Sequence, residues 1–170
     1  MMPHYTAFIR ALNVGGMSVI KMDELRRRFE KLGFTNVQTV LASGNVLFDA
    51  KGSAAAATKA IESIGYTAMV RTGAEVREIA EYQPFGEKNP ENLYIALLEK
   101  KPAADAIKRL VASGPDQFHV NGMEAYWLRP SDASQLPSGN IFEKILGVKS
   151  TMRGVKTIRR IAAVFGDNRV

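Results

Sequence analysis

The order of apolar and polar runs in the first 72 residues constrains the fold more than any other feature. Between about residues 4 and 12, odd- and even-numbered positions both carry apolar residues, which predicts a central strand. Apolar residues then recur at helical spacing from Met22 to Leu32, which predicts an amphipathic helix. A hairpin of two β-rich runs, a second helix and a further strand follow, in the ranges 35–42, 45–49, 53–64 and 66–71. The order is therefore βαββαβ, the ferredoxin-like unit, in which two helices cover one face of a four-stranded antiparallel sheet.

The remainder of the chain nearly repeats this order. A capping box at Thr72 to Glu75 begins a helix that leads into a turn-rich linker. A strand, a helix, a hairpin around Asn121-Gly122 and two further helices follow, without a clear final strand. We therefore predict an α+β protein of tandem ferredoxin-like halves, with mainly antiparallel sheets and helices on one face. The expected parts are a first half over 1–72, a helix and linker over 73–91, and a second half with the C-terminal helix over 92–170.

Composition narrows the classes of function. The absence of cysteine excludes disulfides, thiol catalysis and cysteine-ligated zinc. His4 and His119 have no second ligand at metal-binding spacing, so we expect no metal and no cofactor. The chain has neither a leader-like start nor an apolar run approaching 18 residues, so we expect a cytoplasmic protein that does not enter a membrane. The sequence does not determine the oligomeric state.

The net charge of +6 is concentrated near the C-terminal end. Residues 144–170 hold seven basic residues against one acidic residue, which indicates a polyanion or an anionic ligand as partner. Lys149, Arg153, Lys156 and Arg160 follow spacings of four, three and four, so the last three would share one outward face of the final helix. The alternative is a solvated helix face with no partner.

Two turns rich in glycine and asparagine flank the first predicted helix: Asn13-Val-Gly-Gly16 and Ser43-Gly-Asn45. In a βαββαβ unit both turns lie at one edge of the sheet, and strand three pairs beside strand one, so they should converge. Backbone N–H groups there, with Lys21, are suited to holding an anion. The alternative is that the turns only reverse the chain.

A second anion position is predicted at the last helix, which Ser150 or Thr151 is expected to cap. Thr151 and Arg153 would then stand at its positive end. The complete set of predicted ligand-binding residues is Arg10, Asn13, Gly15, Gly16, Lys21, Ser43, Gly44, Asn45, Thr151 and Arg153.

Several of these residues carry a resemblance to a known family. Ile9–Gly16, Met22–Leu25, Leu32–Phe34 and Ser43–Phe48, with weaker echoes at Val70–Thr72 and Thr151–Arg153, resemble the bacterial domain-of-unknown-function 1697 family. The segment from Gly154 departs from the family pattern, which has an asparagine after the arginine. The resemblance implies a ferredoxin-like duplication and no established activity.

Three functions fit these observations. The first is binding of an anionic or phosphate-bearing ligand, a nucleotide or nucleic acid, at the sheet edge formed by residues 13–16 and 43–45, called the glycine edge below. The second is an enzyme acting on a small anionic substrate, in which Asn13, Ser43 and Asn45 would stabilise developing negative charge. No general base is evident near Ser43, so the catalytic residues stay unassigned. The third is a module that binds an acidic protein partner through the basic face.

Overall fold

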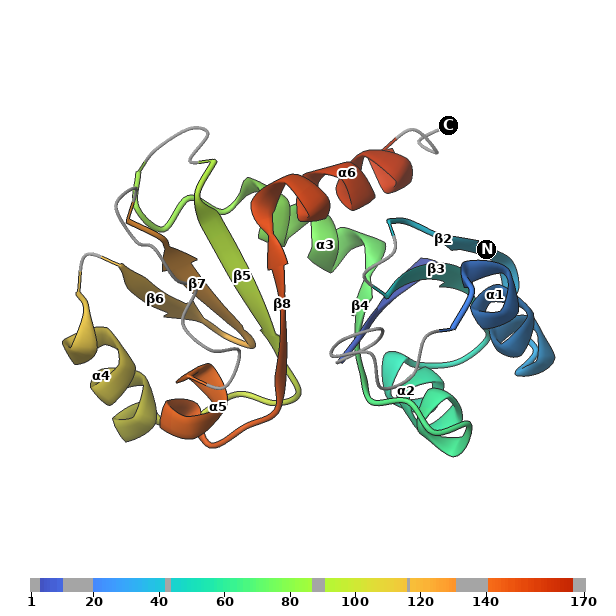
Figure 1. Ribbon diagram of the computed structural model, residues 1–170, viewed down its shortest axis with the longest axis horizontal. Helices are drawn as coiled ribbons and strands as arrows, with labels where there is room; N and C mark the ends of the chain where they lie inside the picture. The colour runs from blue at the N-terminus through green and yellow to red at the C-terminus, as the bar shows by residue number, and fades with distance from the viewer. Residues whose placement is uncertain are drawn as a thin grey trace. The chain divides into compact units, whose positions relative to one another are not determined.

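The computed structural model describes residues 4–10, 20–41, 44–86, 91–115, 117–130 and 141–166. These residues form an α+β protein with two four-stranded antiparallel sheets and six helices (Figure 1). The chain divides into two compact units, of which the first comprises Met1–Arg77 and Ile161–Val170 and the second Glu78–Arg160. Within the described ranges, none of the helices has the length and apolar content needed to span a bilayer.

The first unit contains a sheet of strand order β2-β3-β1-β4. Its elements are β1 (His4–Ile9), α1 (Met22–Lys31), β2 (Thr35–Thr39), β3 (Asn45–Asp49), α2 (Ala54–Ser63) and β4 (Ala68–Thr72). This is the order expected from the sequence, although β1 ends at Ile9 and β2 at Thr39, earlier than predicted. Residues 11 and 12, assigned to strand one from the sequence, lie outside the described residues.

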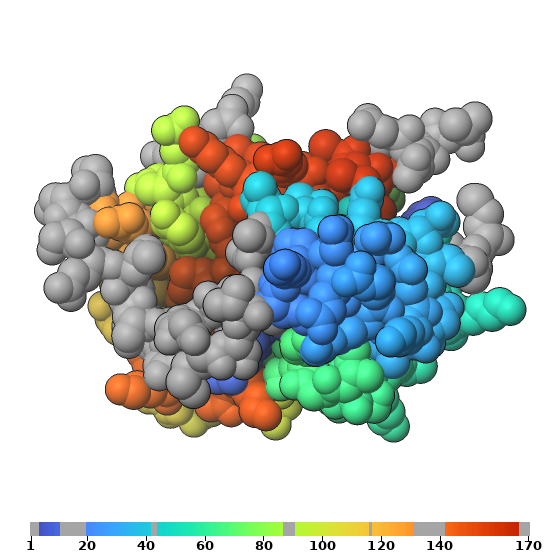
Figure 2. All heavy atoms as spheres, turned by 45° about the vertical axis from the view of Figure 1, so that its right-hand side comes forward, coloured from blue at the N-terminus to red at the C-terminus, as the bar shows by residue number. Residues whose placement is uncertain are grey.

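One face of this sheet packs against both helices. Alternate strand residues such as Tyr5, Ala7 and Phe48 share a core with Leu25 and Phe29 of α1 and with two residues of α2, Ala57 and Ile61. Figure 2 shows the residues of α1 and α2 side by side on the surface of the unit. Arg28 of α1 also donates a hydrogen bond to the hydroxyl of Tyr66, which follows α2 in the chain. The apolar faces of the two amphipathic helices therefore pack on one face of the sheet, and the two layers enclose one core.

The opposite face of the first sheet is buried as well. Thr6, Phe8, Leu47, Met69 and Arg71 alternate with the helix-facing residues along their strands, and each is almost fully removed from solvent. Phe8, Leu47 and Met69 make this face mostly apolar, and Thr6 and Arg71 are its buried polar residues. Burial on both faces of the sheet explains why β1 is apolar at both odd- and even-numbered positions.

The second unit contains a sheet of order β6-β7-β5-β8. Its strands are β5 (Leu93–Leu98), β6 (Phe118–Asn121), β7 (Glu124–Leu128) and β8 (Ser150–Gly154), and its helices are α4 (Ala104–Ser113) and α5 (Ile141–Leu146). The predicted hairpin at Asn121-Gly122 is confirmed, with Asn121 opposite Glu124 and Gly122 at a φ of 62°. Two further helices, α3 (Gly73–Glu81) and α6 (Val155–Gly166), begin in one unit and end in the other.

The strand β8 corrects the prediction that the second half lacks a final strand. Its register with β5 runs from Leu98 opposite Ser150 to Tyr94 opposite Gly154. The strand was missed because Ser150, Thr151 and Arg153 give it no apolar alternation. Consequently α6 begins at Val155, and neither Ser150 nor Thr151 caps it.

Candidate functional site

The described part of the predicted glycine edge lies where β1 ends and β3 begins. Phe8 is opposite Asn45, and the Ile9 amide donates to the Gly44 carbonyl at 2.9 Å. The prediction that strand three pairs beside strand one is confirmed. The predicted convergence of Asn45 with Asn13 involves a residue outside the described part of the chain. Arg10 follows Ile9 directly and is partly exposed, and its amide donates to the Thr67 carbonyl at 2.8 Å.

The side chain of Asn45 closes this hairpin from inside. Asn45 is 0% exposed, and its Nδ2 donates to the Val40 carbonyl at 2.9 Å. The Val40 amide donates back to the Asn45 carbonyl at 2.9 Å. Positive φ angles of 59° at Leu41 and 84° at Gly44 complete the reversal. The amide of Asn45 thus has a structural partner, as expected for a residue that shapes a turn.

Lys21 lies at the start of α1 and is exposed. Its carbonyl accepts a hydrogen bond from the Leu25 amide at 3.0 Å, while its side chain makes no capping bond. Asp23 and Glu24 follow in the first turn, where they stabilise the helix and compete with any bound anion. Arg28 partly offsets the negative charge of these two residues, because its Nη2 donates a hydrogen bond to Glu24 at 2.7 Å. Asn13, Gly15, Gly16 and Ser43 lie outside the described residues.

Thr151 and Arg153 do not stand at a helix N-terminus, so this prediction is wrong. Both belong to β8 and each is 8% exposed. The Arg153 guanidinium donates to the Thr151 hydroxyl at 2.7 Å and to the Met152 carbonyl at 2.9 Å. Burial lowers the pKa of Arg153 to about 10, because the charged form loses water.

The basic residues predicted to share one outward face of the final helix, Arg153, Lys156 and Arg160, do not form a single helical face either. Lys149 precedes β8 and Arg153 is buried in it, so only Lys156 and Arg160 lie on α6, where both are exposed. Lys156 is within 3.7 Å of Glu91. An ion pair this exposed contributes little to stability, and both side chains stay in contact with solvent.

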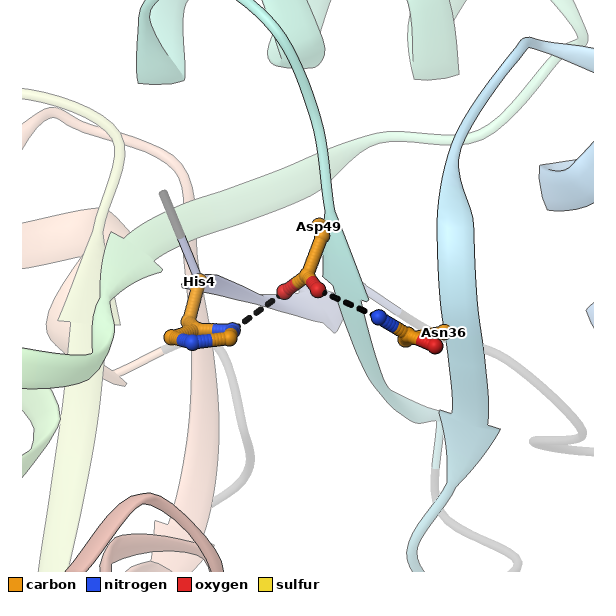
Figure 3. Close-up of polar contacts among 3 residues, drawn as sticks. All are labelled: His4, Asn36 and Asp49. Atoms are coloured by element: carbon orange, nitrogen blue, oxygen red, sulfur yellow. Dashed lines mark hydrogen bonds and ion pairs between the residues drawn. The ribbon is translucent and has the colours of Figure 1, made fainter. Parts of the chain in front are cut away.

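A polar cluster that the sequence did not predict lies at the opposite end of β1 and β3. Asp49 ends β3 and is directly opposite His4, the first residue of β1. Its Oδ1 is hydrogen-bonded to Nδ1 of His4, and its Oδ2 accepts from Nδ2 of Asn36 at 2.7 Å. Figure 3 shows the carboxylate lying between the imidazole and the amide.

The cluster lines a cavity of about 310 Å³ in the first unit. The Asp49 side chain is 8% exposed, whereas that of His4 is 45% exposed. Further lining residues are Gln38 of β2 and Val164 and Phe165 of α6. An imidazole oriented by a buried carboxylate is suited to accept or transfer a proton, and the cavity gives it room for a ligand.

Sequence reasoning missed this cluster because His4 and Asp49 are 45 positions apart and match no motif. One signal was present. Once strands one and three are taken as antiparallel neighbours with Phe8 opposite Asn45, counting four residues back and four forward places His4 opposite Asp49. The position of Asn36, in contrast, depends on an irregularity between Thr35 and Gln38 that the residue pattern does not predict.

Comparisons with known proteins give a family and a fold. The family model described as "Protein of unknown function (DUF1697)" matches residues 2–126. Among solved structures, a conserved bacterial protein from Streptococcus pneumoniae is similar, with 17% sequence identity and a TM-score of 0.67. The match covers 96% of this chain and 98% of that one, which shows a shared fold over nearly the whole length. No curated protein matches the chain.

Proposed function

The chain belongs to the DUF1697 family of proteins of unknown function, and from the geometry of its first unit we propose that it binds a small phosphate-bearing ligand, such as a nucleotide, beside the β2–β3 hairpin. The residues assigned to this role are Arg10, Asn13, Gly15, Gly16, Lys21, Ser43, Gly44 and Asn45. Asn45 acts indirectly, by fixing the hairpin.

One observation carries the proposal, namely the hydrogen bond from the Ile9 amide to the Gly44 carbonyl. It brings the end of β1 against the hairpin, so Arg10, which is partly exposed, directly follows the residue that is bonded to the Gly44 turn. Arginine is well suited to this role because its planar guanidinium binds phosphate oxygens through two parallel hydrogen bonds. Lys21 supplies a second, exposed cation at the start of α1.

A titration with a fluorescent ATP analogue tests the proposal. Arg10→Ala should weaken binding about 10- to 100-fold, because a charge-assisted hydrogen bond of about 1.5–3 kcal/mol is lost. Arg27→Ala provides the matched control, since Arg27 is an exposed arginine of α1 and makes the same change in charge. Binding of the analogue should also weaken as salt is added.

Equal affinity of the two variants would contradict the proposed site, and failure of the intact protein to bind the analogue or inorganic pyrophosphate would contradict the proposed ligand class. Hydrolysis of the analogue during the titration would favour the alternative of an enzyme acting on an anionic substrate.

The same proposal includes an evolutionary and a cellular part. The two halves are tandem ferredoxin-like units that arose by duplication in a bacterial protein of the cytoplasm. The matching strand orders β2-β3-β1-β4 and β6-β7-β5-β8 support duplication. So do Arg71 and Arg153, which are both buried in the fourth strand of a sheet, opposite the third residue of the unit's first strand. A cysteine-free composition supports the cytoplasm.

A further inference from the structure

We propose that the cavity around His4 is a second binding site, one that takes an organic amine with a short apolar or aromatic portion. It lies at the end of β1 remote from Arg10 and draws on different residues, so it is independent of the phosphate site. Its volume of about 310 Å³ is at the lower end of ligand cavities in proteins, which suits a small ligand.

The first element of the site is an oriented hydrogen-bond acceptor. Asp49 is held on one oxygen by Asn36 and bonds Nδ1 of His4 with the other. A carboxylate at Nδ1 selects the tautomer that carries its proton there, which leaves Nε2 with a lone pair. No described residue hydrogen-bonds to Nε2, and His4 is exposed toward solvent. An ammonium N–H fits this acceptor.

The second element is the charge of the lining. Among the described residues that line the cavity, Asp49 is the acidic residue and none is lysine or arginine. Asp49 therefore supplies the negative charge of the lining, and its carboxylate is shielded from water because the side chain is 8% exposed. Asn36 adds an acceptor, because its Nδ2 is directed to Asp49 and its Oδ1 is not. This distribution attracts a cation and repels an anion.

The third element is an aromatic wall. Phe165 lines the cavity with its ring centroid 6.1 Å from that of His4 and tilted by 46°. A cation within about 6 Å of an aromatic ring is attracted by the ring's quadrupole. Val164 extends the wall with aliphatic surface for the carbon portion of the ligand.

The backbone at Asn36 leaves the regular strand conformation. Asn36 has a φ of 49°, in the left-handed region, and lies within the irregular stretch of β2 between Thr35 and Gln38. Asparagine adopts this region more readily than other non-glycine residues, because its short polar side chain can form local hydrogen bonds. In this protein the conformation coincides with the Asn36–Asp49 hydrogen bond that fixes the cluster.

The test uses the full chain and three probes that share one ring: benzylamine, benzoate and benzyl alcohol. The chain holds two histidines, so the imidazole proton signals of His4 and His119 are readily separated by NMR. At about pH 8, benzylamine should shift the His4 signal in a saturable way, whereas the anion and the alcohol should not. The His119 signal should stay unchanged.

Charge variants at the rim separate binding from folding. Gln38 is exposed, so Gln38→Glu should leave the fold intact and tighten benzylamine binding about two- to fivefold, and Gln38→Lys should weaken it by a similar factor. Gln83→Glu, an identical change at an exposed residue outside the cavity, should have no effect. Asp49→Asn should abolish the shift. Benzoate or benzyl alcohol binding as well as benzylamine, no binding of benzylamine, or indifference to Gln38→Glu would overturn the proposal.

Discussion

The buried hydroxyl of Thr6 is the most informative single polar atom of the first unit. Among the described residues, Oγ1 of Thr6 is a buried side-chain oxygen with no hydrogen-bond partner. The residue is 0% exposed and lies opposite Leu47 and Arg71 in the sheet. A buried hydroxyl without a partner costs about 1–3 kcal/mol of desolvation.

Thr6→Val removes this hydroxyl and keeps the shape of the side chain. We expect the free energy of unfolding to rise by about 1 kcal/mol, measured by urea denaturation. Thr72→Val is the matched control because the Thr72 hydroxyl accepts a hydrogen bond from the Glu75 amide at 3.1 Å. That variant should lose about 1 kcal/mol. A Thr6→Val protein less stable than the parent would mean that the hydroxyl has a partner, such as a water or a ligand.

His4 shows how much of the candidate sites was predictable from single residues. Its imidazole is evident from the sequence, but the hydrogen bond that orients it comes from Asp49, which lies opposite it only through strand pairing. Arg153 shows the converse, because its charge was noticed and its burial was not. A residue type defines which interactions are available, whereas the surroundings decide which of them form.

At the scale of elements, α2 illustrates a local signal that the fold preserves. Serine is a favoured N-cap residue, and Oγ of Ser53 accepts a hydrogen bond from the Ala56 amide at 3.1 Å. The cap satisfies one of the amides that every helix start leaves without an intrahelical partner. Short-range geometry of this kind depends on four consecutive residues, so it can be read from the sequence.

Replacing Ser53 by alanine should therefore lower the free energy of unfolding by about 1 kcal/mol in thermal or urea denaturation. Ser63→Ala, at the other end of the same helix, makes the same chemical change where the hydroxyl donates to the Ala60 carbonyl at 2.5 Å on an exposed surface. We expect at most a few tenths of a kcal/mol there. Equal losses in the two variants would refute a capping role for Ser53.

The strand β8 is the element that lay beyond a local reading. Its residues Ser150, Thr151 and Arg153 are polar, and strand formation depends on pairing with β5, more than 50 positions earlier in the chain. The glycine edge was predictable to the extent that strand order is: the pairing of strand three with strand one follows from the βαββαβ pattern, whereas the register that places Phe8 opposite Asn45 does not. The hydrogen bond by which the Asn45 side chain closes the hairpin does not follow from this pattern.

At the scale of the molecule, the last described helix completes the first unit from the far end of the chain. Ile161 is 0% exposed and Phe165 is 7% exposed, and both belong to the unit that contains β1. Phe165 contacts the His4 ring and lies against Gly73, where an added Cβ would meet the Phe165 ring at 3.0 Å. The C-terminal segment is thus a structural part of the N-terminal unit.

Phe165→Ala should destabilise the protein by about 3 kcal/mol, since it removes a large buried side chain and leaves a cavity. Hydrogen exchange should accelerate at the amides of β1 and β3, even though these strands are about 120–160 residues away in sequence. Ala163→Ser, on an exposed position of the same helix, should leave exchange unchanged. Unaltered exchange in β1 and β3 of Phe165→Ala would contradict the assignment of residues 161–166 to the first unit.

The amino-acid sequence by itself determined the elements whose signals are short-range. Helix α1, the cap of α2 and the hairpins before Asn45 and after Asn121 depend on apolar spacing, capping and turn residues within a few positions. Only the tertiary structure decided that residues 150–154 form a strand, that Arg153 is buried and that Asp49 holds His4. The physical reason is that strand pairing and desolvation draw their free energy from partners far along the chain, which no local window contains.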